Sequence, residues 1–247
     1  MGLLLNALTP VAKASSVTVA VASNFSQAAK ALEADFESRQ SARVRLVLGS
    51  SAKLFAQINH GAPFDILLSA DEAKPQALIE LGLAQASQYF VYALGSLVLW
   101  SADAQRVADG ESVLRACAVD KLALANPRLA PYGLAAQQTL QALGCYESLQ
   151  GKLVMGENVG QTFQFVVSGN APLGFVAAAQ LRSWQRQVDT LQWGSYWPVP
   201  TDFHQPIRQA GVLLNRARRN SAAQAFIRYL ASPEAKHIIQ DQGYQLP

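Results

Sequence analysis

Small polar residues and glycines gather at three points where a β-rich run passes into a helical pattern. The three segments are Ala22-Ser23-Asn24, Gly49-Ser50-Ser51 and Glu157-Asn158-Val159-Gly160-Gln161. The N–H groups in the first turn of a helix have no partner inside that helix and lie at the positive end of its dipole, so they bind anions readily. Serine hydroxyls add donors that can rotate toward a ligand. Ordinary helix capping is the simpler explanation of any single junction, so only the three together favour an anion site.

The segments around these junctions alternate between strand and helix patterns. Apolar, β-rich runs predict strands, and apolar residues at helical spacing predict a helix after each of the first three. The strands are expected at 17–21, 44–48, 66–68, 97–100, 122–125, 173–176 and 210–214, with closing helices at 222–230 and 233–241. Residues 192–206, rich in Trp, Tyr, Pro and Gly, are expected to form a long irregular connection. This order predicts an α/β fold with mostly parallel sheets flanked by helices, in which ligands bind beyond the carboxyl ends of the strands.

The 247 residues contain no Pro/Ser-rich linker that would divide them into two consecutive domains. We therefore expect two lobes built from discontinuous pieces, with the chain crossing between them twice. Lobe I would comprise residues 17–93 plus 205–247, and lobe II residues 94–204.

The first 16 residues resemble the remnant of a secretory leader. A short apolar region begins at Leu3, and Ala12-Lys13-Ala14 offers a small-x-small cleavage site, although the usual basic segment before them is missing. We therefore expect an exported, periplasmic protein. In such a protein, Cys117 and Cys145 form either a disulfide or two buried free thiols, and the sequence leaves both possibilities open.

Composition and charge exclude several other classes of protein. The net charge of +3 is dispersed apart from a short run around Arg218, so no basic block indicates nucleic acid. No apolar stretch reaches the roughly 18–20 residues that a membrane span requires. The three histidines are scattered, without metal-ligand spacing or a nucleophile partner, and the sequence therefore does not predict an enzyme.

Five segments of the chain, taken in order, resemble one known family. They are Val19-Ala20-Val21-Ala22-Ser23-Asn24, Gly49-Ser50-Ser51, Gly61-Ala62-Pro63-Phe64-Asp65 with Ser69-Ala70-Asp71, Asn126-Pro127-Arg128-Leu129-Ala130-Pro131-Tyr132-Gly133, and Asn158-Val159-Gly160-Gln161. Their order and spacing are similar to those of the periplasmic molybdate-binding proteins of ABC importers, over about residues 17–247. The resemblance implies a bilobal, type II-like periplasmic-binding-protein fold. It also implies a bound molybdate or tungstate, an ABC transporter permease as partner, a monomer, and no separate cofactor.

The same resemblance assigns the ligand contacts. Ser23 and Asn24 would form the first contact and Ser51 the second, through backbone N–H groups assisted by their side chains. Tyr132 would donate its phenol, and Val159 only its backbone N–H. Molybdenum or tungsten would be present only as the oxyanion, without direct protein ligands. Many family members place the binding tyrosine in a later strand. This chain has Phe175-Val176-Ala177-Ala178 there, without a hydroxyl, so we expect Tyr132 to contact the ligand instead.

Other residues and other functions remain as alternatives. Asp65 and Asp71 would repel a dianion, so we expect them to shape the loop and hinge. Lys53 either lies in solvent in the first turn of its helix or supplies a positive charge to the bound anion.

A site made only of hydrogen-bond donors suits sulfate as well as molybdate, so the alternative function within binding proteins is a sulfate-type or other oxyanion carrier. A ligand-sensing regulatory domain is the alternative of another class, which the absence of a helix-turn-helix pattern before Val17 disfavours.

Overall fold

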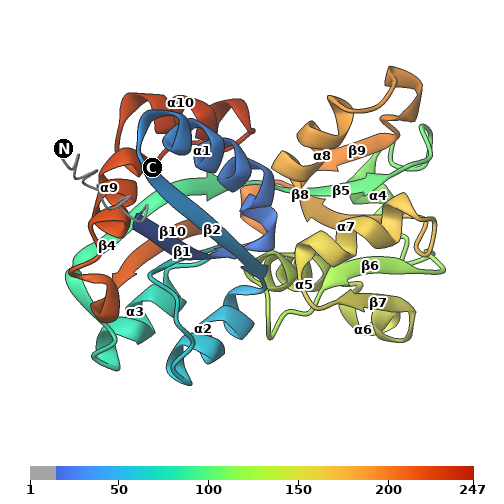
Figure 1. The fold of residues 1–247 in the computed structure, drawn as a ribbon. Helices are drawn as coiled ribbons and strands as arrows, with labels where there is room; N and C mark the ends of the chain where they lie inside the picture. Colours follow the sequence, from blue (N-terminus) through green and yellow to red (C-terminus); the bar gives the residue numbers. More distant parts are fainter. Residues whose placement is uncertain (1–14) are drawn as a thin grey trace, which may run out of the picture.

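The strands of the computed structural model, which describes residues 15–247, form two separate five-stranded sheets (Figure 1). The first has the order β2-β1-β3-β10-β4 and the second the order β7-β6-β8-β5-β9. The predicted leader lies almost wholly outside the described residues. The strands of the first sheet are β1 (Ser15–Ala22), β2 (Ala42–Gly49), β3 (Ile66–Ser69), β4 (Ala84–Gly95) and β10 (Ile207–Leu214). Those of the second are β5 (Leu97–Ser101), β6 (Leu122–Ala125), β7 (Leu153–Gly156), β8 (Gly174–Ala177) and β9 (Ser195–Pro198).

Alternation along the buried strands divides the first sheet into two apolar faces. In β1, Val19 and Val21 join the core under three helices, whereas Ala20 joins the core under two others, because successive side chains point to opposite faces. The first face is covered by α1 (Ser26–Arg39), α9 (Ser221–Leu230) and α10 (Pro233–Asp241), and the second by α2 (Ser51–Asn59) and α3 (Ala73–Glu80). This sandwich forms lobe I.

The second sheet is covered on both faces in the same way and forms lobe II. In β5, Leu97 and Leu99 face one core, and Val98 and Trp100 face the other, where Trp100 stacks on Phe163 at 5.0 Å between ring centroids. The first core lies under α4 (Gly110–Arg115), α5 (Pro131–Ala142) and α6 (Tyr146–Leu149), and the second under α7 (Val159–Val167) and α8 (Ala178–Gln185).

The two crossings between lobes account for the antiparallel pairing in each sheet. Only Ser96 separates β4 of lobe I from β5 of lobe II, and the chain returns from β9 to β10 through residues 199–206. β10 and β4 pair antiparallel in the first sheet, as do β5 and β9 in the second. The predicted bilobal α/β fold is confirmed, but the sheets are mixed, because the strand that enters each lobe, β10 in the first and β5 in the second, runs against its neighbours on both sides.

Two local differences from the sequence prediction bear on the site. Helical spacing in the sequence predicts a helix over residues 134–143, whereas α5 begins at Pro131, which suits the first turn because proline has no N–H to leave unpaired. Tyr132 therefore lies in the first turn of α5. The connection expected to be irregular contains β9, which closes the edge of the second sheet.

Within residues 15–247, none of the helices combines the length and apolar character needed to cross a membrane.

Candidate functional site

Parallel pairing in lobe I brings two of the polar junctions to one edge of the sheet. Ala22, the last residue of β1, lies opposite Gly49, the last residue of β2. Ser23 and Ser51 therefore follow neighbouring strand ends, and Ser51 begins α2. β3 runs parallel on the other side of β1, so the turn after Ser69 joins the same edge.

Lobe II presents the matching edge. Ala125 at the end of β6 pairs in parallel register with Gly156 at the end of β7. The chain then enters α5 after β6 and α7 after β7, so the first turns holding Tyr132 and Val159 both follow this edge of the sheet. Asn158 caps α7 by accepting a hydrogen bond from the Gln161 N–H at 3.0 Å. Val159, as the first residue of that helix, has an N–H without a partner inside the helix.

The two edges are in contact across the lobes. The Gly160 N–H donates to Oγ of Ser23 at 3.3 Å, and the Ala52 N–H donates to the Leu129 carbonyl at 3.1 Å. At the rim, Lys53 Nζ lies 2.6 Å from a carboxylate oxygen of Glu157. Both members of this ion pair are about half exposed, so it contributes no more than about 1 kcal/mol. The lobes are therefore closed upon each other at the strand ends.

Asn24 does not cap α1, although its place just before that helix is typical of a cap. It lies in a 3₁₀ turn, η1 (Ser23–Phe25), and α1 begins at Ser26 without a side-chain cap. The buried Asn24 amide donates to Oε1 of Gln209 at 2.7 Å and to the Tyr244 hydroxyl at 3.2 Å. Tyr244 in turn donates to the Asn24 carbonyl at 2.7 Å. Asn24 is therefore held rigidly at the cleft, with its side chain engaged in the protein.

Tyr132 reaches the same network from lobe II. Its side chain is buried, and its hydroxyl accepts a hydrogen bond from Nε2 of Gln209 at 3.4 Å. Burial, followed by the neighbouring Tyr244 and Tyr92 hydroxyls, raises the pKa of Tyr132 well above its usual value, although hydrogen bonds from Asn24 and Gln209 oppose the rise. The phenol therefore keeps its proton at neutral and moderately alkaline pH and remains a hydrogen-bond donor.

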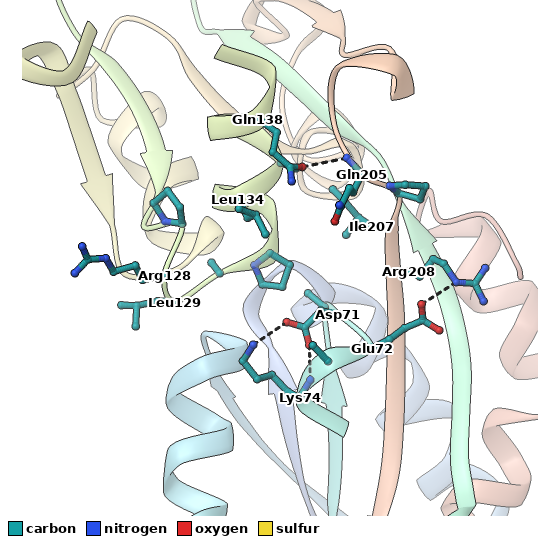
Figure 2. Close-up of a pocket in the computed structure, with 17 residues that line it drawn as sticks. Asp71, Glu72, Lys74, Arg128, Leu129, Leu134, Gln138, Gln205, Ile207 and Arg208 are labelled. Carbon is teal, nitrogen blue, oxygen red and sulfur yellow. Dashed lines mark hydrogen bonds and ion pairs between the residues drawn. The ribbon is translucent and has the colours of Figure 1, made fainter. Parts of the chain in front are cut away.

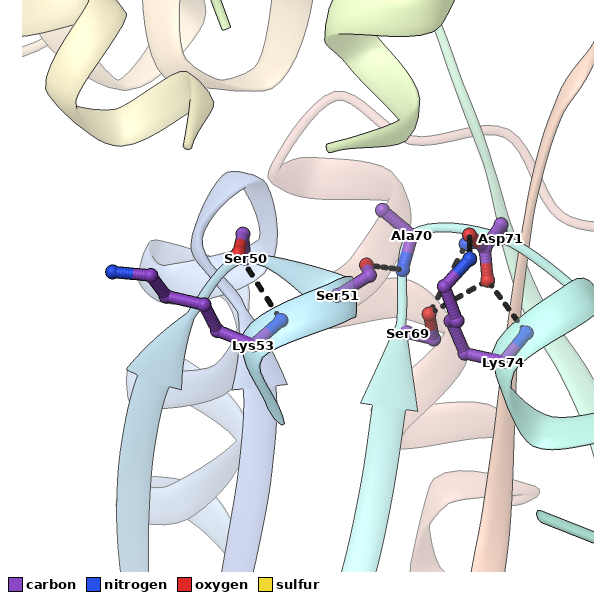
Figure 3. A network of polar contacts seen from close by, with 7 residues as sticks. All are labelled: Ser50, Ser51, Lys53, Ser69, Ala70, Asp71 and Lys74. Atoms are coloured by element: carbon purple, nitrogen blue, oxygen red, sulfur yellow. Dashed lines mark hydrogen bonds and ion pairs between the residues drawn. The ribbon is translucent and has the colours of Figure 1, made fainter. Parts of the chain in front are cut away.

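Ser51 is buried in the first turn of α2, directly after the residue that caps this helix. The cap is Ser50, whose hydroxyl accepts a long hydrogen bond from the Lys53 N–H at 3.4 Å. Oγ of Ser51 accepts from the Ala70 N–H at 3.0 Å (Figure 3). Because this bond uses a lone pair, the hydroxyl proton of Ser51 stays available for a ligand.

Asp65 and Asp71, the two carboxylates in the segments that resemble the family, are engaged in hydrogen bonds and ion pairs within lobe I. Asp65 accepts from the Thr18 N–H at 2.7 Å and lies 3.6 Å from Arg216. Asp71 accepts from the Lys74 N–H and from the Ser69 hydroxyl, both at 3.0 Å, and forms an ion pair with Lys74 (Figure 3). The Asp71 contacts fix the turn after β3, and the Asp65 contacts tie the residue before β3 to β1 and to Arg216.

A cavity of about 300 Å³ opens beside the closed cleft, between α3, the β6–α5 loop and the start of β10 (Figure 2). Its carboxylates are paired within the protein, Asp71 with Lys74 and Glu72 with Arg208 at 3.0 Å. A second cavity of about 230 Å³ lies on the other flank, around Ser26 and Gly160. The five predicted contact residues line neither of these cavities. The larger cavity is lined by Lys74, Arg128 and Arg208 as well as by the two carboxylates, so it presents charges of both signs.

Gln209 joins the two lobes at this point, and no pattern in the sequence analysis indicated it. Gln209, in β10, is fully buried and contacts Asn24 and Tyr132, and its Oε1 also accepts from the Tyr92 hydroxyl at 3.3 Å. The available signal was a glutamine inside an otherwise apolar strand. Its partners lie far away in the sequence, so no local pattern names them. In the described part of the chain, no cluster of three or more His, Cys, Asp or Glu side chains could hold a metal ion.

The sequence profile described as "Bacterial extracellular solute-binding protein" matches residues 17–245. The chain belongs to this family. Membership implies an extracytoplasmic solute-binding protein of a transport system, and the predicted resemblance is confirmed at this level.

Three relatives are similar over nearly their whole length. The molybdate-binding protein ModA of Rhodobacter capsulatus is 42% identical over 94% of this chain and 89% of its own. That of Azotobacter vinelandii is also 42% identical, over 97% of this chain and 93% of its own. The solved structure of the Azotobacter vinelandii periplasmic molybdate-binding protein superposes with a TM-score of 0.87 at 36% identity, covering 94% of this chain and 99% of that one.

We predict that Gln209→Leu destabilises the folded protein by about 1–3 kcal/mol, because it removes one hydrogen bond each from the buried Asn24 amide, the Tyr92 hydroxyl and the Tyr132 hydroxyl. Urea unfolding followed by circular dichroism measures this loss. Gln141→Leu, on the exposed side of α5, is the matched control and should change stability by less than about 0.5 kcal/mol. Equal stability of the two variants would contradict the role assigned to Gln209.

Proposed function

We propose that this protein binds one tetrahedral oxyanion, molybdate or tungstate, between its closed lobes and delivers it to an ABC import permease. The observation that carries the proposal is the meeting of helix first turns from both lobes at one closed cleft, where the protein offers neutral donors. The printed names of the relatives at 42% identity support the choice of anion.

In the proposed complex, each of the five residues donates a hydrogen bond to the anion. Ser23 and Ser51 each contribute a backbone N–H and a hydroxyl proton, since each Oγ already accepts a backbone N–H, from Gly160 and Ala70 respectively. Tyr132 contributes its neutral phenol, and Val159 the N–H at the start of α7. Asn24, whose side-chain amide is engaged by Gln209, contributes its backbone N–H in η1.

Hydrogen bonds of this kind are strong enough for tight binding. Each one to a charged group contributes roughly 1.5–3 kcal/mol. About six or seven of them reach the about −12 kcal/mol of nanomolar affinity after the costs of association. No arginine or lysine is needed in contact with the ligand, which fits the pairing of Lys53 with Glu157.

A ring of donors selects for anions that carry no proton. Molybdate, tungstate and sulfate are fully deprotonated at neutral pH, whereas phosphate retains a proton and requires an acceptor. Sulfate is the alternative ligand, separated from molybdate by size. In this proposal the metal enters only within the oxyanion, and the protein carries no separate cofactor and catalyses no reaction. The site is complete within one chain, so we propose that the protein acts as a periplasmic monomer.

Calorimetric titration with molybdate, tungstate, sulfate and phosphate tests the proposed function. Molybdate and tungstate should each bind at one site and raise the melting temperature with ligand concentration, whereas phosphate should have no effect. Binding of sulfate without molybdate or tungstate would overturn the proposed ligand, and absence of any response to all four anions would overturn the proposed function.

For the site itself, we predict that Tyr132→Phe weakens molybdate binding roughly tenfold to a hundredfold, because it removes one donor to a charged ligand. Calorimetry measures the affinity, and thermal unfolding verifies that the variant is folded. Tyr196→Phe, at a half-exposed residue of β9, is the matched control and should bind like the unmodified protein. Unchanged affinity in the Tyr132 variant would show that the phenol lies outside the donor ring.

A further inference from the structure

Gly95 lies at the hinge, where the chain leaves lobe I. It is the last residue of β4, only Ser96 separates it from β5, and it pairs with Ile207, the first residue of β10. Both crossings between the lobes therefore pass beside Gly95. Its φ is not among the positive values found at other glycines, so left-handed backbone geometry does not require a glycine here.

Polar side chains from both lobes fill the space where a side chain of residue 95 would lie. A Cβ atom on Gly95 would overlap the Tyr132 hydroxyl oxygen, and it would lie 2.8 Å from Nε2 of Gln209. Protein interiors are too closely packed for such an approach, so a neighbouring group would have to move. Because Gly95 ends a strand of lobe I and Tyr132 belongs to lobe II, this close approach is a contact between the lobes.

Tyr132 has little freedom to move away from Gly95. Its side chain is buried in the lobe II core. The next residue, Gly133, packs so tightly that a Cβ atom there would overlap the Ala125 carbonyl oxygen, which presses the first turn of α5 against the end of β6. A methyl group at residue 95 would therefore push against a ring that cannot retreat without disturbing the lobe II core.

Gln209 is equally constrained. It is fully buried, and its Oε1 accepts from the Asn24 amide at 2.7 Å and from the Tyr92 hydroxyl at 3.3 Å. A shift of this side chain away from Gly95 would weaken both bonds among buried polar groups, which is costly. The absence of a side chain at Gly95 is therefore what leaves room for the Gln209 amide to meet the Tyr132 hydroxyl at 3.4 Å.

We propose that Gly95 is a positioning residue, which gives the Tyr132 phenol its place when the lobes close. The inference rests on the proposed function, because it concerns the hydrogen bond that Tyr132 gives to the anion. Gly95 acts through Tyr132 and does not itself touch the ligand. A larger residue at position 95 displaces the phenol or holds lobe II away from lobe I, and either change weakens the ring of donors.

Thermal unfolding without any anion tests the contact itself. Gly95→Ala should lower the melting temperature by roughly 3–10 °C, because overpacking a filled interior is costly. In the Tyr132→Phe protein the same substitution should lower it by less than half as much, because the hydroxyl that overlaps the added methyl group is gone. Equal losses in the two backgrounds would overturn the proposal.

Two further variants separate this contact from a general cost of replacing glycine. Gly151→Ala is the matched control, because Gly151 is exposed, its φ is not positive, and a Cβ atom there would meet nothing within 4 Å. It should change the melting temperature by less than about 2 °C, and a loss as large as that of Gly95→Ala would overturn the contact as the cause. If Gly95→Ala alone does not fold, the double variant Gly95→Ala/Tyr132→Phe should fold, and its failure would also overturn the proposal.

Calorimetric titration with molybdate tests the effect on the ligand. Gly95→Ala should weaken binding roughly tenfold or more, because it misplaces one donor to a charged group. In the Tyr132→Phe protein, which has already lost the phenol, it should have little further effect. Unchanged affinity of Gly95→Ala would overturn the positioning role. The unfolding measurements need no anion, so failure of the unmodified protein to bind molybdate would count against the proposed function alone.

Discussion

The first turn of every helix leaves backbone N–H groups without partners inside that helix, and in this protein several such turns meet at one place. Parallel pairing of β1 with β2, and of β6 with β7, brings the helix starts of each lobe to one sheet edge. The two edges face each other across the hinge. Their N–H groups and hydroxyls are partly satisfied within the protein, and those that remain define what the cleft can bind.

A buried polar network gives this cleft its fixed geometry. Gln209 lies on β10, the strand that returns from lobe II, and it joins Asn24 of lobe I to Tyr132 of lobe II. Buried polar groups are costly unless each has a partner, so the closed arrangement of the lobes and the hydrogen bonds of these side chains depend on one another. The phenol of Tyr132 stays protonated for the same reason, because burial disfavours its charged form.

Local patterns predicted most of the strands, because apolar runs and helical spacing are properties of short segments, whereas the two lobes were expected from the absence of a linker and from the family resemblance. They did not indicate β4, β7 and β9, nor the role of Asn24, which is set by the distant Gln209 and Tyr244. The contact residues were predicted from family resemblance, and the structure places them on facing edges. Their contact with an anion stays a prediction, because hydrogen-bond donors identify the charge of a ligand but not its identity.

The most direct test of the donor ring is a crystal structure of the protein grown with molybdate, with anomalous diffraction recorded at the molybdenum edge. The account predicts one molybdenum peak between the lobes, with its oxygens within hydrogen-bonding distance of the Ser23, Ser51 and Tyr132 hydroxyls and the Val159 N–H. A molybdenum peak in the cavity beside Asp71 and Glu72, or no ordered peak between the lobes, would contradict it.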